Sequence, residues 1–199
     1  MLSKNRENLK NLSESIGRFL SRLPMSPNGY TLLSLILAVL SFYFIVRKTF
    51  FLAIFFFVLA AMMDFVDGAV ARFSGKVTKI GAYLDTILDR YVESIILGGF
   101  LFLTLPEILV PSYVWITLAI LGSLMTTYSK AAAREKELTS GELKGGIFER
   151  TERLIFIFIA LLATLFKPEF SIYPLIILAI FSNLSALQRV HLVLKLQSR

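Results

Sequence analysis

The sequence predicts an all-α integral membrane protein, built as a six-transmembrane-helix bundle with an N-terminal interfacial amphipathic helix. Of its 199 residues 56% are hydrophobic and only 18% are charged, whereas soluble domains carry roughly 25% charged residues. Several apolar runs approach the ~20 residues that a helix needs to cross a bilayer. The chain has no cysteine and one histidine, which excludes disulfides, thiolate metal sites and histidine-rich metal sites. The low fraction of charged residues and the long apolar runs also exclude a soluble enzyme.

Six apolar segments define the expected bundle. They span residues 30–46, 49–67, 80–104, 108–128, 153–166 and 171–193. An even number of spans places both termini on one side of the membrane. Most lysines and arginines fall on that side, while Arg47, Lys48 and Lys167 fall in the opposite loops. The positive-inside rule therefore predicts that both termini are cytoplasmic.

The N-terminal 25 residues predict an interfacial helix, and residues 26–199 form the predicted membrane domain. Apolar residues recur at helical spacing among basic ones before residue 25: Leu9, Leu12, Ile16, Phe19, Leu20 and Leu23. This pattern is typical of a helix lying in the membrane surface, with a solvated tail as the alternative. Ser26-Pro27-Asn28-Gly29 predicts a turn that ends this helix. The net charge is +7. We expect the basic residues to contact anionic lipids rather than nucleic acid, because the sequence contains no soluble module that would present this charge to a nucleic acid.

Four carboxylates lie at or near the ends of the second and third apolar segments. Asp64 and Asp67 are three residues apart, and Asp85 and Asp89 are four apart, so each pair shares one helix face. If the two helix faces come together, they form a cluster of four like charges. Without a bound cation these carboxylates would repel one another or take up protons. An all-oxygen site favours Mg²⁺ or Mn²⁺, with Ca²⁺ as an alternative. Two ions sharing these ligands would clamp a pyrophosphate.

The residues between the two pairs point to a nucleotide diphosphate group. Gly68, Ala71 and Gly81 let a ligand approach the backbone closely, and Arg72 supplies a planar fork for phosphate oxygens. The structural alternative is that the aspartates form ion pairs with Arg72 and Arg90. Two arginines do not neutralise four carboxylates, so this alternative is the weaker one.

From Asp64 to Asp89 the chain resembles the CDP-alcohol phosphotransferases. It matches their signature D-x2-D-G-x2-A-R-x8-G-x3-D-x3-D at all eight fixed positions. The resemblance implies transfer from a CDP-linked alcohol to an acceptor alcohol, with release of CMP, and a homodimer. It implies that Asp64, Asp67, Asp85 and Asp89 hold the metals and that Asp89 is also the general base. The implied CDP-lipid contacts are Asn28, Gly29, Tyr30, Thr31, Gly68, Ala71, Arg72, Thr78 and Gly81. We expect direct in-line displacement, because no Ser, Cys or His nucleophile stands near the motif.

A second polar region carries the cations expected to bind the acceptor's phosphate: Lys130, Arg150, Arg153 and Arg189. This region resembles the branch of the family that makes phosphatidylinositol phosphate or archaetidylinositol phosphate from inositol phosphate. In that branch, positions like Lys130, Arg153 and Arg189 line the acceptor's phosphate pocket. Relatives often carry an arginine where this chain has Ala132, and whether Arg134 replaces it stays open. Ordinary positive-inside anchoring is the alternative reading of these cations.

Other functions are compatible with parts of this pattern. Glycerol phosphate would also suit a basic pocket, and a soluble CDP-inositol donor is open because the CDP-binding residues do not read a lipid tail. A cation transporter, for which intramembrane carboxylates are typical, would not need Gly68, Ala71, Arg72 and Gly81 in fixed relation to the aspartates. An aspartate-rich prenyltransferase would need a second motif, and residues 94–199 contain no aspartate.

Overall fold

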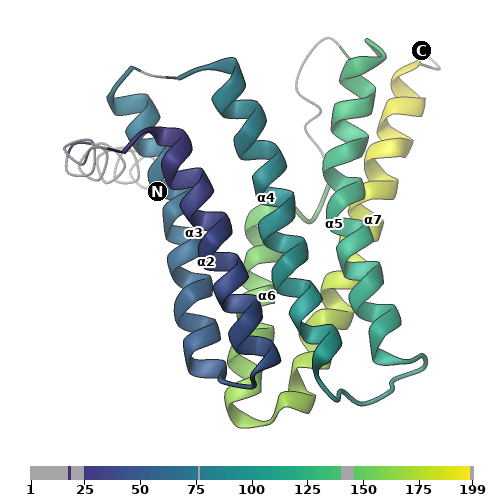
Figure 1. The fold of residues 1–199 in the computed structure, drawn as a ribbon. Helices are drawn as coiled ribbons and strands as arrows, with labels where there is room; N and C mark the ends of the chain where they lie inside the picture. The colour runs from purple at the N-terminus through teal and green to yellow at the C-terminus, as the bar shows by residue number, and fades with distance from the viewer. Residues whose placement is uncertain (1–17, 19–24, 76, 140–145, 198–199) are drawn as a thin grey trace, which may run out of the picture. The chain divides into compact units, whose positions relative to one another are not determined.

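The computed structural model describes residues 18, 25–75, 77–139 and 146–197. This part of the chain forms six α-helices (Figure 1): α2 Pro27–Val46, α3 Phe50–Phe73, α4 Lys79–Gly99, α5 Ser112–Glu135, α6 Arg150–Phe166 and α7 Ile172–Gln197. Short 3-10 helices, Phe100–Phe102 and Pro168–Ser171, follow α4 and precede α7. Each predicted apolar segment corresponds to one of these helices. The all-α prediction is thus confirmed, while the interfacial helix expected within residues 1–25 lies almost wholly outside the described residues.

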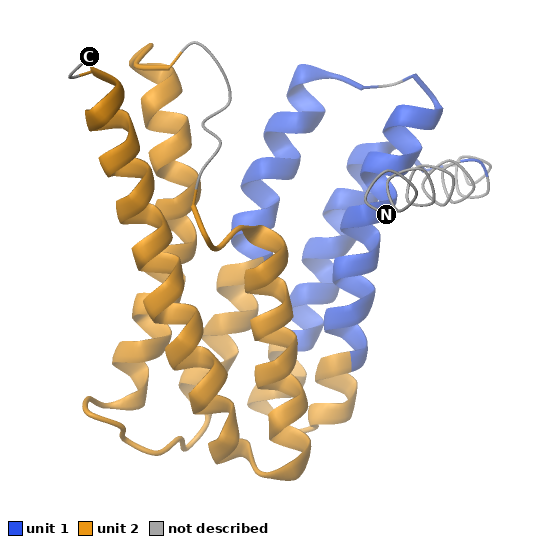
Figure 2. Cartoon of the chain, turned by 180° about the vertical axis from the view of Figure 1, so that it is seen from behind, with its two compact units in different colours: residues 1–41, 55–92 blue, residues 42–54, 93–199 orange. Residues whose placement is uncertain are grey.

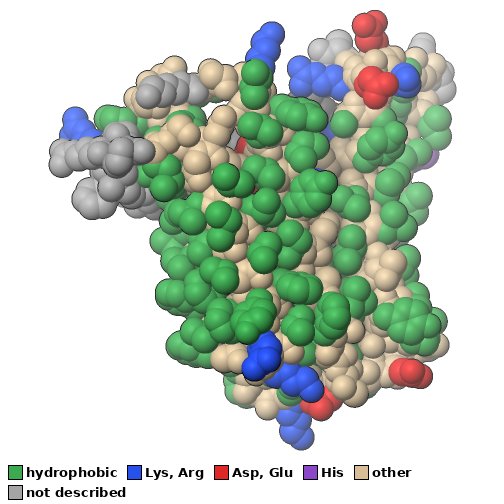
Figure 3. All heavy atoms as spheres, in the orientation of Figure 1, with side chains coloured by type: hydrophobic (Ala, Val, Ile, Leu, Met, Phe, Trp, Pro, Cys, Tyr) green, Lys and Arg blue, Asp and Glu red, His purple; other side chains and the backbone are tan. Residues whose placement is uncertain are grey.

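Three stretches of the described chain are long and apolar enough to cross a membrane. They are α2, α3 and the segment Pro168–Gln197 that contains α7, with hydropathies of 2.1, 2.2 and 1.9. Large hydrophobic side chains on these helices face outward, among them Phe51 at 74% exposure. On the face drawn in Figure 3, hydrophobic side chains cover the helix flanks and charged ones gather near the helix ends. The protein is therefore a membrane protein, and the count of six spans stays a prediction.

The segment Ser26–Gly29 begins a helix, so the turn expected there is wrong. The Ser26 hydroxyl accepts a hydrogen bond from the backbone N–H of Gly29 at 3.2 Å, as an N-cap serine does. Pro27 occupies the first helical position of α2, where a missing N–H does no harm. The residue types are those of a turn, but serine followed by proline is equally a helix start.

The chain divides into two compact units, which Figure 2 colours separately. The first unit contains residues 1–41 and 55–92, and thus the first part of α2, the C-terminal part of α3 and the first part of α4. Tyr30 of α2 packs against Val66 and Val70 of α3, with Met63 beside them. This apolar contact holds the first turns of α2 against the part of α3 that carries Asp64 and Asp67.

The second unit contains residues 42–54 and 93–199, and α5 and α7 pack closely in it. A Cβ added to Gly122 of α5 would lie 2.7 Å from the Cβ of Ser182 on α7, so the two backbones approach at a small residue. The Asn183 amide nitrogen donates to the carbonyl oxygen of Leu118 at 2.8 Å. This contact sets the register between α5, which carries Lys130, and α7, which carries Arg189.

Candidate active site

Three of the four predicted metal ligands come together in the first unit. Asp64 and Asp67 of α3 and Asp85 of α4 each place a carboxylate oxygen within 4.8 Å of the other two. Asp67 is only 6% exposed. The set contains oxygen donors alone, which fits a hard divalent cation such as Mg²⁺, Mn²⁺ or Ca²⁺. A cation would also offset the mutual repulsion of three carboxylates.

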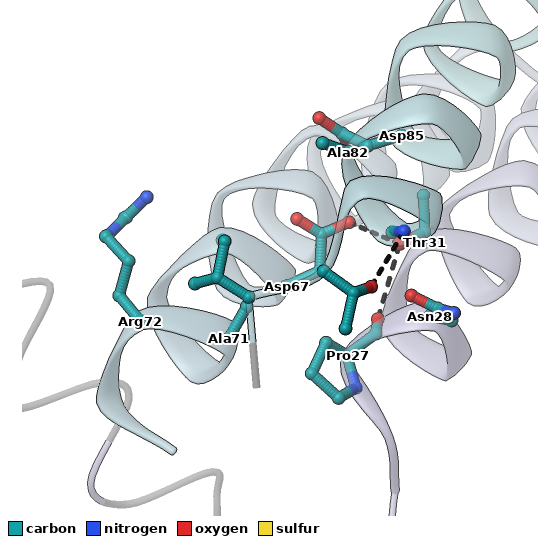
Figure 4. Close-up of a pocket in the computed structure, with 12 residues that line it drawn as sticks. Pro27, Asn28, Thr31, Asp67, Ala71, Arg72, Ala82 and Asp85 are labelled. Atoms are coloured by element: carbon teal, nitrogen blue, oxygen red, sulfur yellow. Dashed lines mark hydrogen bonds between the residues drawn. The ribbon is translucent and has the colours of Figure 1, made fainter. Parts of the chain in front are cut away.

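The orientation of Asp67 is set by Thr31. The Thr31 hydroxyl donates to Oδ2 of Asp67 at 2.7 Å, and both side chains are buried. The same hydroxyl lies 3.3 Å from the carbonyl oxygen of Pro27, but its single proton favours the shorter, charge-assisted bond. Figure 4 shows Thr31 reaching from α2 toward this carboxylate. The sequence predicted Thr31 as a CDP-lipid contact, and the structure adds that it positions a predicted metal ligand.

A pocket adjoins these carboxylates within the same unit. It is lined by Pro27, Asn28, Thr31, Asp67, Gly68, Ala71, Arg72, Val77, Thr78, Gly81, Ala82 and Asp85 (Figure 4). Most of the predicted CDP-lipid contacts are among them. Tyr30 and Gly29 are not: Tyr30 is 3% exposed and belongs to the α2–α3 apolar cluster. The resemblance to the family implied both residues as CDP-lipid contacts, and their role stays a prediction.

Gly81 keeps one wall of this pocket narrow. A Cβ at Gly81 would lie 3.0 Å from the Thr78 hydroxyl and 3.2 Å from Oδ1 of Asn28. The Thr78 hydroxyl accepts a hydrogen bond from the Gly81 backbone N–H at 3.0 Å, which caps the start of α4. Thr78 and Asn28 therefore approach the α4 backbone only because residue 81 has no side chain.

Asp89 lies one helical turn beyond Asp85 on α4 and is not part of the three-carboxylate group. It is 8% exposed, and its Oδ2 lies 3.7 Å from Nη2 of Arg90. The spacing of four residues keeps it on the same helix face as Asp85. Asp89 therefore lies on the Asp85 face of α4 but outside the three-carboxylate group.

Arg153, predicted to bind the acceptor's phosphate, forms a buried ion pair in the second unit. Its Nε donates to Oε2 of Glu93 at 3.0 Å and its Nη2 to Oε1 at 3.2 Å, while Nη1 donates to the Thr126 hydroxyl at 3.0 Å. Arg153 is 2% exposed and Glu93 is 0% exposed. Glu93 is not among the residues predicted from the sequence, although a carboxylate four residues after Asp89 within an apolar segment indicates a buried partner.

Lys130 and Arg189 converge on one carboxylate. Lys130 Nζ and Arg189 Nη2 each lie 3.8 Å from the same oxygen, Oε1 of Glu149. Arg189 is 3% exposed, and its Nη1 donates to the carbonyl oxygen of Thr126. Arg150 lies with its Nε 3.6 Å from Oε1 of Glu93. Thr126 thus binds Arg153 through its hydroxyl and Arg189 through its carbonyl.

Comparison with known proteins identifies the family. The model of the CDP-alcohol phosphatidyltransferases matches residues 24–190. The chain belongs to this family. The match includes the three-carboxylate group, the adjoining pocket and the second unit's basic residues.

Curated CDP-alcohol phosphatidyltransferase relatives are similar over much of the chain. The archaetidylinositol phosphate synthase of Pyrococcus horikoshii is 37% identical over 192 residues, covering 96% of this chain and 95% of that protein. The bifunctional IPC transferase and DIPP synthase of Aquifex aeolicus is 34% identical over 143 residues, which cover 68% of this chain but 31% of that protein.

Solved structures of one such transferase share the fold. The Mycobacterium tuberculosis phosphatidylinositol phosphate synthase with CDP-DAG bound superposes with a TM-score of 0.79 at 25% identity, covering 92% of this chain and 94% of that one. The same enzyme in complex with manganese and citrate gives a TM-score of 0.80 at 26% identity, covering 92% of this chain and 88% of that one.

Proposed function

We propose that this CDP-alcohol phosphatidyltransferase moves a phosphatidyl-type group from a CDP-lipid to inositol phosphate and releases CMP. The observation that carries the proposal is the group of Asp64, Asp67 and Asp85, which opens onto a pocket lined by Asn28, Gly68 and Arg72. The names of similar proteins, an archaetidylinositol phosphate synthase and a phosphatidylinositol phosphate synthase, support inositol phosphate as the acceptor. The lipid is either diacyl or an archaeal ether lipid.

The aspartates are proposed to hold two divalent ions, Mg²⁺ or Mn²⁺. Bound ions would neutralise charge on the pyrophosphate and on the leaving CMP. Asp64, Asp67 and Asp85 are the ligands, and Thr31 keeps Asp67 in one orientation through its 2.7 Å hydrogen bond. Asp89 is an additional ligand and the general base that takes the proton of the acceptor hydroxyl. A manganese complex of the similar mycobacterial enzyme supports the metal.

The pocket beside the aspartates is proposed to bind the CDP group. Arg72 offers two parallel N–H donors to a phosphate oxygen pair. Gly68 and Gly81 let the nucleotide approach the helix backbones closely. Asn28 and Thr78 supply polar atoms at the wall that Gly81 keeps narrow.

The acceptor's phosphate is proposed to bind Lys130, Arg189 and Arg150 at the ends of α5, α7 and α6. Lys130 and Arg189 already converge on a single anionic oxygen, and a phosphate presents the same charge type. Arg153 is a positioning residue in this proposal, since Glu93 and Thr126 engage all three of its nitrogens.

The remaining parts of the proposal concern the setting of the site. We propose that all six helices cross the membrane, that both termini and the active site face the cytoplasm, and that residues 26–199 form the membrane domain. The excess of basic residues on one side of the predicted bundle supports this orientation. The protein acts as a homodimer.

The test is CMP release by the purified protein with Mg²⁺ or Mn²⁺ and a CDP-lipid. Inositol phosphate, glycerol phosphate, free inositol and serine serve as acceptors, and a chelator serves as the metal control. Release with inositol phosphate and not with the others is expected. Release with glycerol phosphate instead would overturn the acceptor while keeping the metal chemistry. CDP-inositol is the second donor to test, because the proposed CDP-binding residues do not read a lipid tail.

A further inference from the structure

The segment Gly146–Glu149, which leads into α6, is fastened to α7. The Ile147 N–H donates to Oε1 of Gln188 at 3.1 Å. The Phe148 N–H donates to the Ser185 hydroxyl at 3.4 Å, and that hydroxyl donates to the Phe148 carbonyl at 3.2 Å. Since both polar groups of Phe148 and the amide of Ile147 bind α7, the position of Glu149 is set by α7.

Gly146 allows the segment Gly146–Glu149 to lie this close to α7. Its φ of +112° lies in the region that only glycine adopts readily. A Cβ at this position would lie 2.4 Å from the Ser185 hydroxyl and 2.9 Å from Nε of Arg189. The backbone therefore passes directly over Arg189, and the chain brings Glu149 to the same guanidinium.

Glu149 holds two cations loosely. Its Oε1 is 3.8 Å from both Lys130 Nζ and Arg189 Nη2, beyond hydrogen-bond distance. Its side chain is 57% exposed, whereas Arg189 is 3% exposed. The pair formed by Glu93 and Arg153 has two hydrogen bonds at 3.0 and 3.2 Å, and both residues are buried. A competing anion can therefore displace Glu149 from Lys130 and Arg189 more readily than it can displace Glu93 from Arg153.

We infer that Glu149 is an internal counter-anion that occupies the place of the acceptor's phosphate and is displaced by it. The inference rests on the proposed function, in which Lys130 and Arg189 bind that phosphate. A phosphate dianion brings more charge and three oxygen acceptors, so it forms charge-assisted hydrogen bonds with both cations where one carboxylate oxygen forms none. A neutral alcohol does not displace Glu149. The carboxylate is therefore a specificity-determining group that favours phosphorylated acceptors.

The test is the binding of inorganic phosphate to purified Glu149→Gln protein, measured by titration calorimetry in detergent. Glutamine keeps the shape and the ability to accept hydrogen bonds at the start of α6, but it removes the competing charge. We expect phosphate to bind about tenfold more tightly than to the wild type, because two weak ion pairs no longer oppose it. Phosphate binding that is unchanged or weaker would overturn the inference.

Glu152→Gln is the matched control. It removes the same charge three residues away, and its side chain accepts a hydrogen bond from the Glu149 N–H at 3.0 Å, which glutamine also accepts. We expect less than a twofold change in phosphate affinity. An equal gain in both variants would show a general charge effect and overturn the role of Glu149. Should Glu149→Gln fold poorly, Glu149→Ser keeps a favourable N-cap residue and tests the same point.

Kinetics separates this inference from the proposed function. With inositol phosphate as acceptor, Glu149→Gln should lower the acceptor KM severalfold without raising kcat. An acceptor KM that does not fall, in an enzyme that does release CMP, contradicts the inference alone. Tighter phosphate binding in a protein that releases no CMP with inositol phosphate contradicts the proposed function alone.

Discussion

The two units arrange their carboxylates in opposite ways. In the first, Asp64, Asp67 and Asp85 gather like charges within 4.8 Å, and Asp67 accepts a hydrogen bond from the neutral hydroxyl of Thr31. In the second, the carboxylate of Glu93 meets the guanidinium of Arg153 through two hydrogen bonds. A group of like charges needs a cation from outside the chain, whereas a balanced pair is complete by itself. The former is the proposed reactive centre, and the latter joins α4 to α6.

This difference changes the reading of individual arginines. Residue type and location near a helix end made Arg153 and Arg189 equivalent candidates for a phosphate pocket. Arg153 has all three nitrogens engaged by Glu93 and Thr126, while Arg189 keeps a loose contact with a half-exposed carboxylate. Partner geometry therefore supports the proposal that Arg189 binds the phosphate and that Arg153 is a positioning residue.

The largest effect is expected for Asp67→Asn, which removes one of the gathered charges. Asparagine still accepts the Thr31 hydrogen bond, so the fold should persist, but CMP release should fall more than about 100-fold. Thr31→Val keeps the charge and removes its positioning hydroxyl, and a loss of about 10–100-fold is expected. The measurement is kcat/KM at saturating metal. Turnover of Asp67→Asn within a few fold of the wild type would contradict the proposal that the three carboxylates form the reactive centre.

The next largest effect concerns stability. Glu93→Gln leaves Arg153 as an uncompensated buried charge and should destabilise the protein by about 3–5 kcal/mol, measured by thermal unfolding in detergent. The double variant Glu93→Leu with Arg153→Met should recover much of this loss, since apolar packing replaces the pair. If Arg153→Met alone raises the acceptor KM and leaves stability intact, Arg153 binds substrate and its assignment as a positioning residue is wrong.

A smaller effect is expected at the donor pocket. Gly81→Val forces Thr78 and Asn28 away from α4, because a Cβ alone would meet them at 3.0 and 3.2 Å. The KM for CDP-lipid should rise about tenfold, equivalent to ~1.4 kcal/mol, with little change in the acceptor KM. Gly98→Val on the same helix is the matched control, since a Cβ there meets nothing within 4 Å. Equal effects of the two variants would point to α4 stability rather than to the pocket.

The smallest effect is expected for a balanced pair at the surface. Lys136 Nζ and Oε1 of Glu135 are 3.0 Å apart with side chains more than two-thirds exposed. Lys136→Ala should change stability by less than about 0.5 kcal/mol and leave both KM values unchanged. A clear loss of activity would place Lys136 among the functional cations and weaken the rule that partner geometry identifies them.

Helices and the metal-binding candidates were accessible from the sequence, because both depend on local spacing. Apolar runs located all six described helices, and the spacing of Asp64, Asp67 and Asp85 placed them on helix faces that meet. The start of α2 was misread because serine, proline, asparagine and glycine are common to turns and to helix N-termini. Ser26 and Pro27 decide this case through an N-cap hydrogen bond that residue types alone do not reveal.

Long-range pairing was the part that sequence did not supply. Glu93 and Arg153 are 60 residues apart, and nothing in the spacing of either relates one to the other. The same holds for Glu149, which meets Arg189 only because Gly146 allows the chain to pass over α7. The burial of Tyr30 against Val66 and Val70 likewise depends on how α2 rotates against α3.

The separation of Glu93 from Arg153 has a consequence for biogenesis. α4 carries Asp85, Asp89, Arg90 and Glu93 and is not among the described helices apolar enough to cross a membrane unaided. Each such charge opposes insertion by roughly 2.5–3.5 kcal/mol. During synthesis α4 leaves the ribosome 60 residues before Arg153 arrives to neutralise Glu93. If α4 crosses the membrane as proposed, its ion pair with Arg153 therefore forms only after α6 has been made.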